Sequence, residues 1–282
     1  MSIPRRLAGA CMVILGVVAG CGVDTYQSRY EETRRYYAYL DKLNHVLGSP
    51  WSGQGVTLRV PKQFQLLPAP APPKEPPPKE KDKDKDKDKD QDKDATPAPP
   101  ERDPRQPTFA PIDLPGLQGA WRASLNLAAN EGRAPGYLYV LSNYKLIAEG
   151  EPKAKEADFN RDVVETIAKA INQPVPDLDK VPIVQHPKRG VEAYVTPLKY
   201  KVVNPGLPAT VEDKEYRIQI YAYAQAKPPS QISIVLIVPQ DLSPSEKLEQ
   251  AMDLCLETLV ITPPPRRNQA VKGKTPTKGR GF

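Results

Sequence analysis

Cysteine and histidine are scarce in this chain, with three cysteines and two histidines among 282 residues. A disulfide framework needs several paired cysteines, and a zinc site needs three or four clustered ligands. His45 and His186 stand alone, and neither an HExxH nor a CxxC pattern occurs. We therefore expect no disulfide framework, no bound metal and no cofactor. Both histidines are expected at the solvated surface.

Catalytic motifs are also missing. The sequence has no G-x-S-x-G, no GxxxxGK[ST] and no GxGxxG, which excludes the usual nucleophile elbow and phosphate cradles. A pair of glycosidase carboxylates has no fixed spacing, because the fold brings the two residues together. The sequence does not single out two of the four candidates, Asp158, Asp162, Glu165 and Glu192. The prediction is that the chain is not an enzyme.

An apolar run without charge occupies the N-terminus. It extends from Leu7 to Gly20 and follows Arg5 and Arg6. A helix needs about 20 apolar residues to cross a bilayer core of about 30 Å, so this run is too short for a lasting span. A positive segment followed by a short apolar one is typical of a secretory signal peptide, predicted here over residues 1–20.

The end of this run, Val18-Ala19-Gly20-Cys21, resembles the bacterial lipobox, and the resemblance covers residues 1–21. It implies cleavage between Gly20 and Cys21, a diacylglycerol on the Cys21 thiol and further acylation of the new amino group. Two or three buried acyl chains anchor a protein stably. The chain would then lie outside the cytoplasm, held at the outer membrane or at the periplasmic face of the inner membrane. Cys255, without a partner, is expected to be a small buried hydrophobe.

The net charge of +6 comes from the C-terminal tail, residues 263–282. This tail carries six basic residues and no acid, so the remainder of the chain sums to zero. Basic residues near an anionic membrane contribute about 1 kcal/mol each. We expect a disordered tail that either has no specific role or contacts anionic lipid or an anionic envelope polymer. Nucleic acid is not expected, because the only aromatic of the tail is Phe282.

Residues 68–107 are rich in proline and contain the Lys-Asp repeat Lys81 to Asp94. They have no aliphatic side chain larger than alanine, so burial cannot offset the entropy of ordering them. A period of two also puts like charges at i,i+4, which disfavours a helix. We predict a disordered segment that is either a spacer or an inserted loop.

Residues 21–50 predict an amphipathic helix. Asp24 and Gln27 form a capping-box pattern, and Gly48 and Pro50 are stop signals. One face follows alternating spacings of four and three: Tyr26, Tyr30, Thr33, Tyr37, Leu40, Asn44 and Leu47. We expect this tyrosine-rich face to pack against the folded domain, with the membrane interface as the alternative. A helix that begins so near Cys21 would place that domain close to the bilayer.

Residues 108–262 predict an α+β domain, an antiparallel sheet flanked by helices. Helices are expected from Asp158 to Asn172 and from Ser243, which can cap, with Glu246 completing a capping box. The clearest strands, Tyr216–Ala224 and Gln231–Val238, predict a hairpin. Further strands are expected at Ala120–Leu127, Tyr137–Leu141 and Leu198–Val203.

Residues 51–67 contain a strand pattern, Gly55 to Pro61, that is expected to belong to the main domain. The order of elements over residues 55–261 resembles the PsbP-like α/β/α sandwich. That resemblance implies that residues 68–107 are a loop inserted in the domain.

These patterns together predict a lipid-anchored, extracytoplasmic envelope protein. Its body is expected to be a non-catalytic structural or binding module. The alternative is a cryptic envelope hydrolase that uses carboxylates assembled by the fold.

Overall fold

The computed structural model describes residues 6–70, 102–108, 110, 112–128, 132–149, 158–186, 195, 197–211, 214–225 and 230–262. Side chains are described from residue 24 onward, except those of residues 204 and 205. The basic tail and most of the Lys-Asp segment, both predicted to be disordered, lie outside these ranges.

A seven-stranded antiparallel sheet forms the centre of the molecule. Its strands, in spatial order, are β3 (Gln65–Leu66), β4 (Leu117–Asn126), β5 (Arg133–Ser142), β9 (Ser230–Pro239), β8 (Lys214–Gln225), β7 (Leu198–Val211) and β6 (Ile183–His186). β9 is buried along nearly its whole length, as its unbroken apolar run Ile234 to Val238 requires of a central strand covered on both faces. β8 and β9 pair from Tyr216↔Pro239 to Gln225↔Ser230, which confirms the predicted hairpin.

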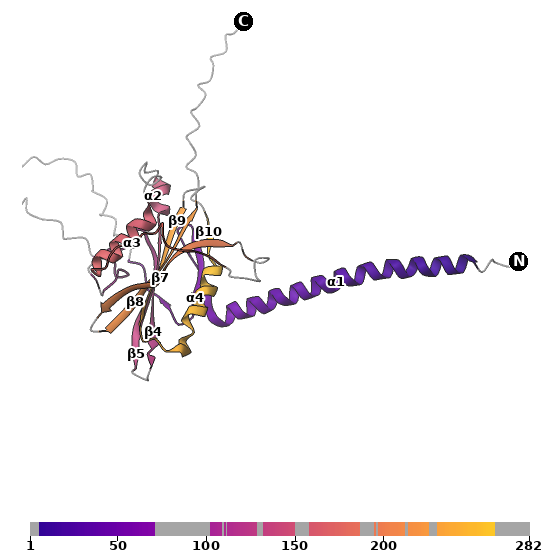
Figure 1. Ribbon diagram of the computed structural model, residues 1–282, viewed down its shortest axis with the longest axis horizontal. Helices are drawn as coiled ribbons and strands as arrows, with labels where there is room; N and C mark the ends of the chain where they lie inside the picture. Colours follow the sequence, from indigo (N-terminus) through magenta and orange to yellow (C-terminus); the bar gives the residue numbers. More distant parts are fainter. Residues whose placement is uncertain are drawn as a thin grey trace, which may run out of the picture.

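One face of this sheet is covered by α3 (Phe159–Ala170), beside the short α2 (Tyr144–Glu149) (Figure 1). Asp158 caps α3, since its side chain accepts a hydrogen bond from the Arg161 backbone N–H at 3.3 Å. The apolar side of α3 packs with sheet residues in one buried cluster that includes Phe159, Val163, Ile167, Tyr139, Ile218, Ile220 and Val235. The helix forms because its apolar residues recur at helical spacing.

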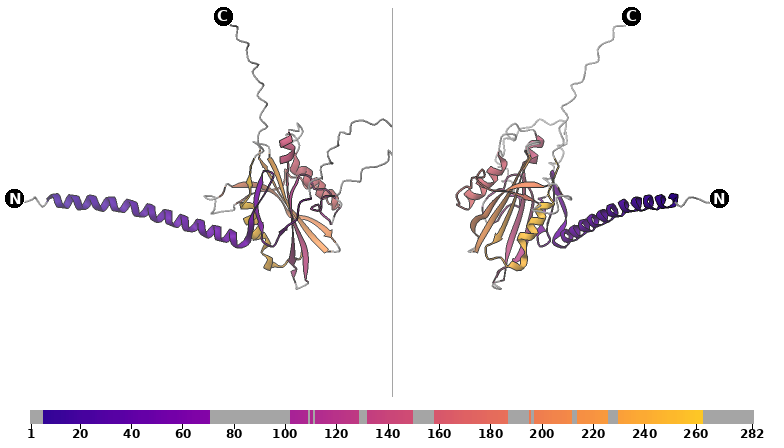
Figure 2. Two further views of the ribbon diagram at one scale, coloured as in Figure 1. Left: turned by 180° about the vertical axis from the view of Figure 1, so that it is seen from behind. Right: turned by 45° about the vertical axis from the view of Figure 1, so that its right-hand side comes forward.

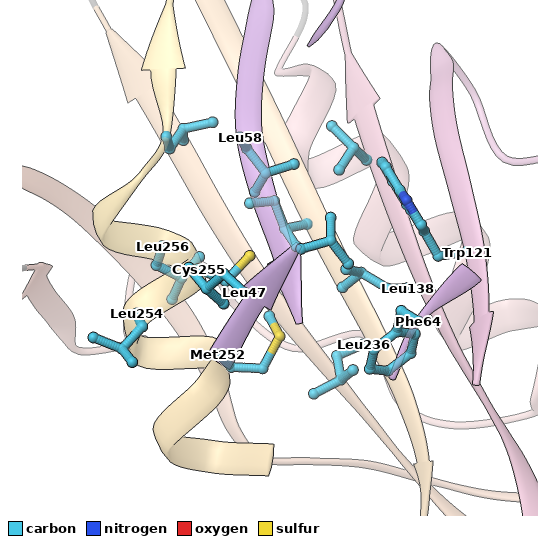
Figure 3. Close-up of a cluster of buried hydrophobic side chains, with 14 of the residues drawn as sticks. Leu47, Leu58, Phe64, Trp121, Leu138, Leu236, Met252, Leu254, Cys255 and Leu256 are labelled. Carbon is cyan, nitrogen blue, oxygen red and sulfur yellow. The ribbon is translucent and has the colours of Figure 1, made fainter. Parts of the chain in front are cut away.

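The opposite face is covered by α4 (Leu248–Glu257) and by a small antiparallel sheet (Figures 1 and 2). The small sheet has the order β1 (Leu47–Gly53), β2 (Val56–Pro61) and β10 (Val260–Ile261). Figure 3 shows the second buried cluster, where Met252 and Cys255 of α4 and Leu58 of β2 lie near Leu138 and Leu236 of the large sheet. The prediction of an α+β fold with an antiparallel sheet flanked by helices is confirmed.

The strand predicted near Val56 lies in the small sheet, so it does not extend the later sheet directly. Val56, Leu58 and Val60 are nevertheless buried in the cluster that they share with the large sheet. A few residues on, β3 pairs with β4 through Gln65↔Arg122 and Leu66↔Trp121. The strands that precede and follow the segment 71–101 in the chain are therefore neighbours in one sheet.

The predicted helix from Ser243 is wrong in one respect. Ser243 caps only a single 3-10 turn, Pro244–Glu246, and Lys247 then takes a left-handed φ of 48° before α4 begins at Leu248. Glu246 does not complete a capping box. Its carboxylate instead accepts hydrogen bonds from the backbone N–H and the side-chain amide of Asn126 in β4. This tertiary contact competes with the local helical pattern and breaks the helix.

Candidate functional site

Cys21 lies on the long helix α1, Arg6–Val46. The backbone around Gly20 and Cys21 is helical, and the side chains of residues 6–23 fall outside the described part of the chain. Asp24 therefore lies inside the helix of the uncleaved chain and is not its first residue. Among the helices that the structure describes, none is long and apolar enough to cross a membrane.

The helix α1 projects from the body, and Cys21 lies about midway between Arg6, where the helix begins, and Tyr39, where it meets the body (Figures 1 and 2). Every side chain from Asp24 to Ala38 is exposed. The expectation that the tyrosine-rich face packs against the folded domain is wrong, because Tyr26, Tyr30 and Tyr37 are 73%, 59% and 60% exposed. These three tyrosines lie on the part of α1 that projects beyond the body.

The base of α1 is joined to the body by a different set of side chains. Tyr39 and Leu43 are buried in the same cluster as α4, and the Tyr39 hydroxyl donates a hydrogen bond to Glu257 Oε2 at 3.2 Å. Arg59 Nη2 donates to Asn44 Oδ1 at 2.9 Å, and Arg59 Nε donates to the Gly48 carbonyl at 2.9 Å. The contact of Tyr39 with Glu257 joins opposite ends of the chain, and together with the two Arg59 bonds it fixes the direction in which the helix leaves the body.

The four candidate carboxylates do not form a described pair. Asp158 and Asp162 are exposed, Asp158 forms an ion pair with Arg161, and Glu192 lies outside the described residues. Glu165 pairs with Lys169, which lowers the pKa of its carboxyl through a hydrogen bond and the opposite charge. A general acid needs a raised pKa, and this environment produces the opposite shift.

His186 contradicts the expectation of a surface position, whereas His45 is exposed as expected. His186 ends β6 and is only 3% exposed. Its ring lies edge-on to Tyr200 at 5.6 Å, and its Nδ1 is 4.0 Å from Asp253 Oδ1 of α4. The prediction failed because β6 is too short to give a period, so His186 looked like part of a loop. Cys255, by contrast, is fully buried as predicted.

A hollow of about 700 Å³ opens at the β3 edge of the large sheet. Arg122 of β4 and Arg133 of β5 line it together with Gln63, Gln65 and Ser124. Arg122 lies 5.9 Å above the Tyr137 ring, and Arg133 Nε donates to Asn126 Oδ1 at 3.0 Å, so both guanidinium groups are oriented. No local sequence pattern predicts this hollow, because its lining comes from both sides of the Lys-Asp segment.

A buried polar network joins α3 to the large sheet. Asn160 Nδ2 donates to the Tyr223 carbonyl at 2.8 Å, and Asn160 Oδ1 accepts from the Ser233 hydroxyl at 2.8 Å. The Asn160 backbone N–H donates to Gln231 Oε1 at 2.9 Å. All these groups find partners within the fold, so the network is structural and offers no reactive group.

Replacing Asn160 with alanine is expected to lower the free energy of unfolding by about 2–4 kcal/mol, because it leaves the Tyr223 carbonyl and the Ser233 hydroxyl buried without this partner. Urea unfolding checks this value. The double variant N160A/S233A also removes the Ser233 hydroxyl that N160A leaves without this partner. The free energy of unfolding that it loses should therefore be smaller than the sum of the losses in the two single variants. Strict additivity would contradict the network.

Among the residues that the structure describes, no group of three or more His, Cys, Asp or Glu side chains could hold a metal ion. Comparison with protein-family models, with curated proteins and with solved structures found no match.

Proposed function

We propose that this chain is a lipid-anchored envelope protein whose helix α1 presents a non-catalytic binding or structural module outside the cytoplasm. The observation that carries the proposal is the placement of Cys21. The lipobox-like cysteine lies on a helix that projects from the body, and no described side chain between Asp24 and Ala38 is buried. A helix so placed can reach a membrane without interference from the folded domain.

The helix also sets how far the body can lie from its anchor. Cys21 and Tyr39, the first buried residue among the side chains described for the helix, are 18 positions apart. At 1.5 Å per residue this is about 27 Å of helix. The expectation that the body lies close to the bilayer therefore holds only if α1 lies along the membrane surface.

The module proposed for the body is one that binds or supports, without catalysis. The described carboxyls with shifted pKa values, Asp103, Glu165, Asp177 and Asp179, all have the pKa lowered by basic or backbone hydrogen-bond partners. A hydrolase would need a carboxyl with a raised pKa in a hollow. The hollow beside Arg122 and Arg133 suits an anionic group better, since arginine recognises carboxylate and phosphate.

The Cys21→Ser substitution is expected to abolish incorporation of a clickable fatty acid, because serine lacks the thiol that accepts the lipid. Labelled cells and gel fluorescence provide the measurement. Cys11→Ser is the matched control, since Cys11 lies in the segment predicted to be removed and should leave labelling unchanged. Labelling that persists in Cys21→Ser would overturn the proposal.

A further inference from the structure

Three large aromatic side chains share one side of the projecting part of α1. Tyr26, Tyr30 and Tyr37 are each more than half exposed. At 100° per residue they fall within an arc of about 40° around the helix axis, so they form a continuous line, here called the tyrosine stripe. Tyrosine combines a large apolar ring with a polar hydroxyl, which suits the boundary between hydrocarbon and water.

The charges of this part of α1 are distributed about the tyrosine stripe. Arg29 and Arg34 lie about 80° and 60° from its centre, one on each side. The acids Asp24, Glu31 and Glu32 all lie about 120° or more from it, on the far side, where Glu31 also pairs with Arg35 at 3.9 Å. The next acid along the helix, Asp41, comes one turn after Tyr37 and ends the stripe. Cations therefore flank the tyrosine stripe, and anions lie opposite it.

The body leaves the tyrosine stripe accessible. Tyr39 and Leu43, which are buried against the body, lie on a side of the helix roughly 120° or more from the centre of the stripe. The body reaches the stripe's side of the helix only beyond Tyr37, at Leu40 and Asn44, so Tyr26, Tyr30 and Tyr37 stay exposed. Tyr26 is five residues from Cys21, or about 7.5 Å along the helix, so a membrane that receives a lipid on Cys21 is within reach of the stripe.

We propose that the tyrosine stripe lies in the headgroup layer of the membrane, with Arg29 and Arg34 on lipid phosphates. That this membrane is the one that holds the lipid on Cys21 rests on the proposed function. The helix then lies along the surface and brings the body beside the bilayer. Basic residues that flank an apolar face are typical of interfacial helices.

A second copy of α1 fits the tyrosine stripe less well. A coiled-coil seam is sustained over three or four heptads, whereas Tyr26 to Tyr37 covers fewer than two. The positions that would continue the seam are already engaged, since Leu40 packs on the body and Asn44 accepts a hydrogen bond from Arg59. The stripe is thus too short for a stable homodimer.

The test uses residues 22–282 without any lipid, which retain every side chain that the structure describes. Partition into vesicles of phosphatidylcholine and phosphatidylglycerol is measured by flotation. Burying part of one tyrosine ring corresponds to about fivefold in partition, so Tyr30→Ser should lose about fivefold and Tyr26→Ser/Tyr30→Ser/Tyr37→Ser about a hundredfold. The basic tail is present in every variant and cancels in these ratios.

Tyr36→Ser is the matched control, because Tyr36 is 39% exposed and lies about 100° from the centre of the stripe. Its partition should change less than twofold. Equal partition of the triple variant and the unchanged protein would overturn the proposal, and so would a dimer in sedimentation equilibrium that the triple variant abolishes. The tested chain carries no lipid. The vesicle result therefore tests the tyrosine stripe separately from the labelling result, which tests the lipid on Cys21.

Discussion

Raising the pH above about 10 is expected to unfold the body within one to two pH units. Burial raises the pKa of Tyr139, Tyr200, Tyr221 and Tyr223 above the ordinary tyrosine value. The pKa of Tyr39 is raised by burial first and by the neighbouring Glu257 carboxylate second. In the unfolded chain these hydroxyls ionise near pH 10, whereas the folded chain keeps them neutral to higher pH.

The sign of this effect follows from proton linkage. Because the pKa values are raised in the folded state, the contribution of these tyrosines is complete below about pH 10 and is lost as the pH rises toward the folded values. Each tyrosine contributes a slope of about 1.4 kcal/mol per pH unit, so five reach about 7 kcal/mol per unit. A domain whose free energy of unfolding is about 5–15 kcal/mol loses all of it within one to two pH units at this slope.

Urea unfolding measured from pH 8 to pH 11.5 checks the alkaline loss. Tyr139→Phe should remove about one fifth of the tyrosine contribution to the slope above pH 10, since one of five ionising tyrosines is removed. Tyr26→Phe is the control, because Tyr26 is exposed and should leave the slope as it is. An unfolding free energy that stays constant up to pH 11.5 would contradict the burial of these tyrosines.

Trp121→Ala is expected to lower the free energy of unfolding by about 3–5 kcal/mol, because a buried tryptophan is replaced by a cavity. Trp121 of β4 is only 3% exposed, and its ring meets Trp51 of β1 edge-on with centroids 4.9 Å apart. The contact joins the large sheet to the small one. Gly119 makes room for both rings, since a Cβ there would lie 2.6 Å from Trp121 Cη2 and 2.7 Å from Trp51 Cζ2.

Trp51→Ala is the matched control for this substitution. Trp51 is only partly buried, so its removal should cost less than that of Trp121. The double variant should show a coupling of about 0.5–1.5 kcal/mol, the usual range for an aromatic pair. Thermal or urea unfolding of the four proteins gives this value, and a coupling of zero would show that the two rings do not join the sheets.

Local patterns were sufficient to predict the elements that carry their own signals. The β8–β9 hairpin follows from the alternation of Tyr216, Ile218 and Ile220 and the apolar run of β9, and α3 follows from its apolar spacing after Asp158. Each signal lies within one short, continuous stretch of the chain. The class of the fold could therefore be predicted before any tertiary contact was known.

Contacts between distant residues could not be predicted in the same way. The spacing of four and three marks Tyr26, Tyr30 and Tyr37 as one face, but it does not say where the body ends, and Leu47 of the same series begins a strand. His186 became buried because α4, which comes much later in the chain, packs against β6. The small sheet is completed by β10, which pairs with β2, a strand that lies far earlier in the chain.

The candidate site shows the same division. The prediction for Cys21 rests on a local four-residue pattern, Val18-Ala19-Gly20-Cys21, and stays a prediction. The joint that directs α1 is not local, since Tyr39 and Glu257 are 218 positions apart. The hollow beside Arg122 is likewise assembled by pairing β3 with β4.

The mass of the N-terminal peptide from membrane-purified protein tests the lipid anchor most directly. The proposal predicts a mature chain that starts at Cys21, carries a diacylglycerol on the thiol and lacks residues 1–20. A chain that retains Met1 to Gly20, or one that starts at Cys21 with a free thiol, would contradict it.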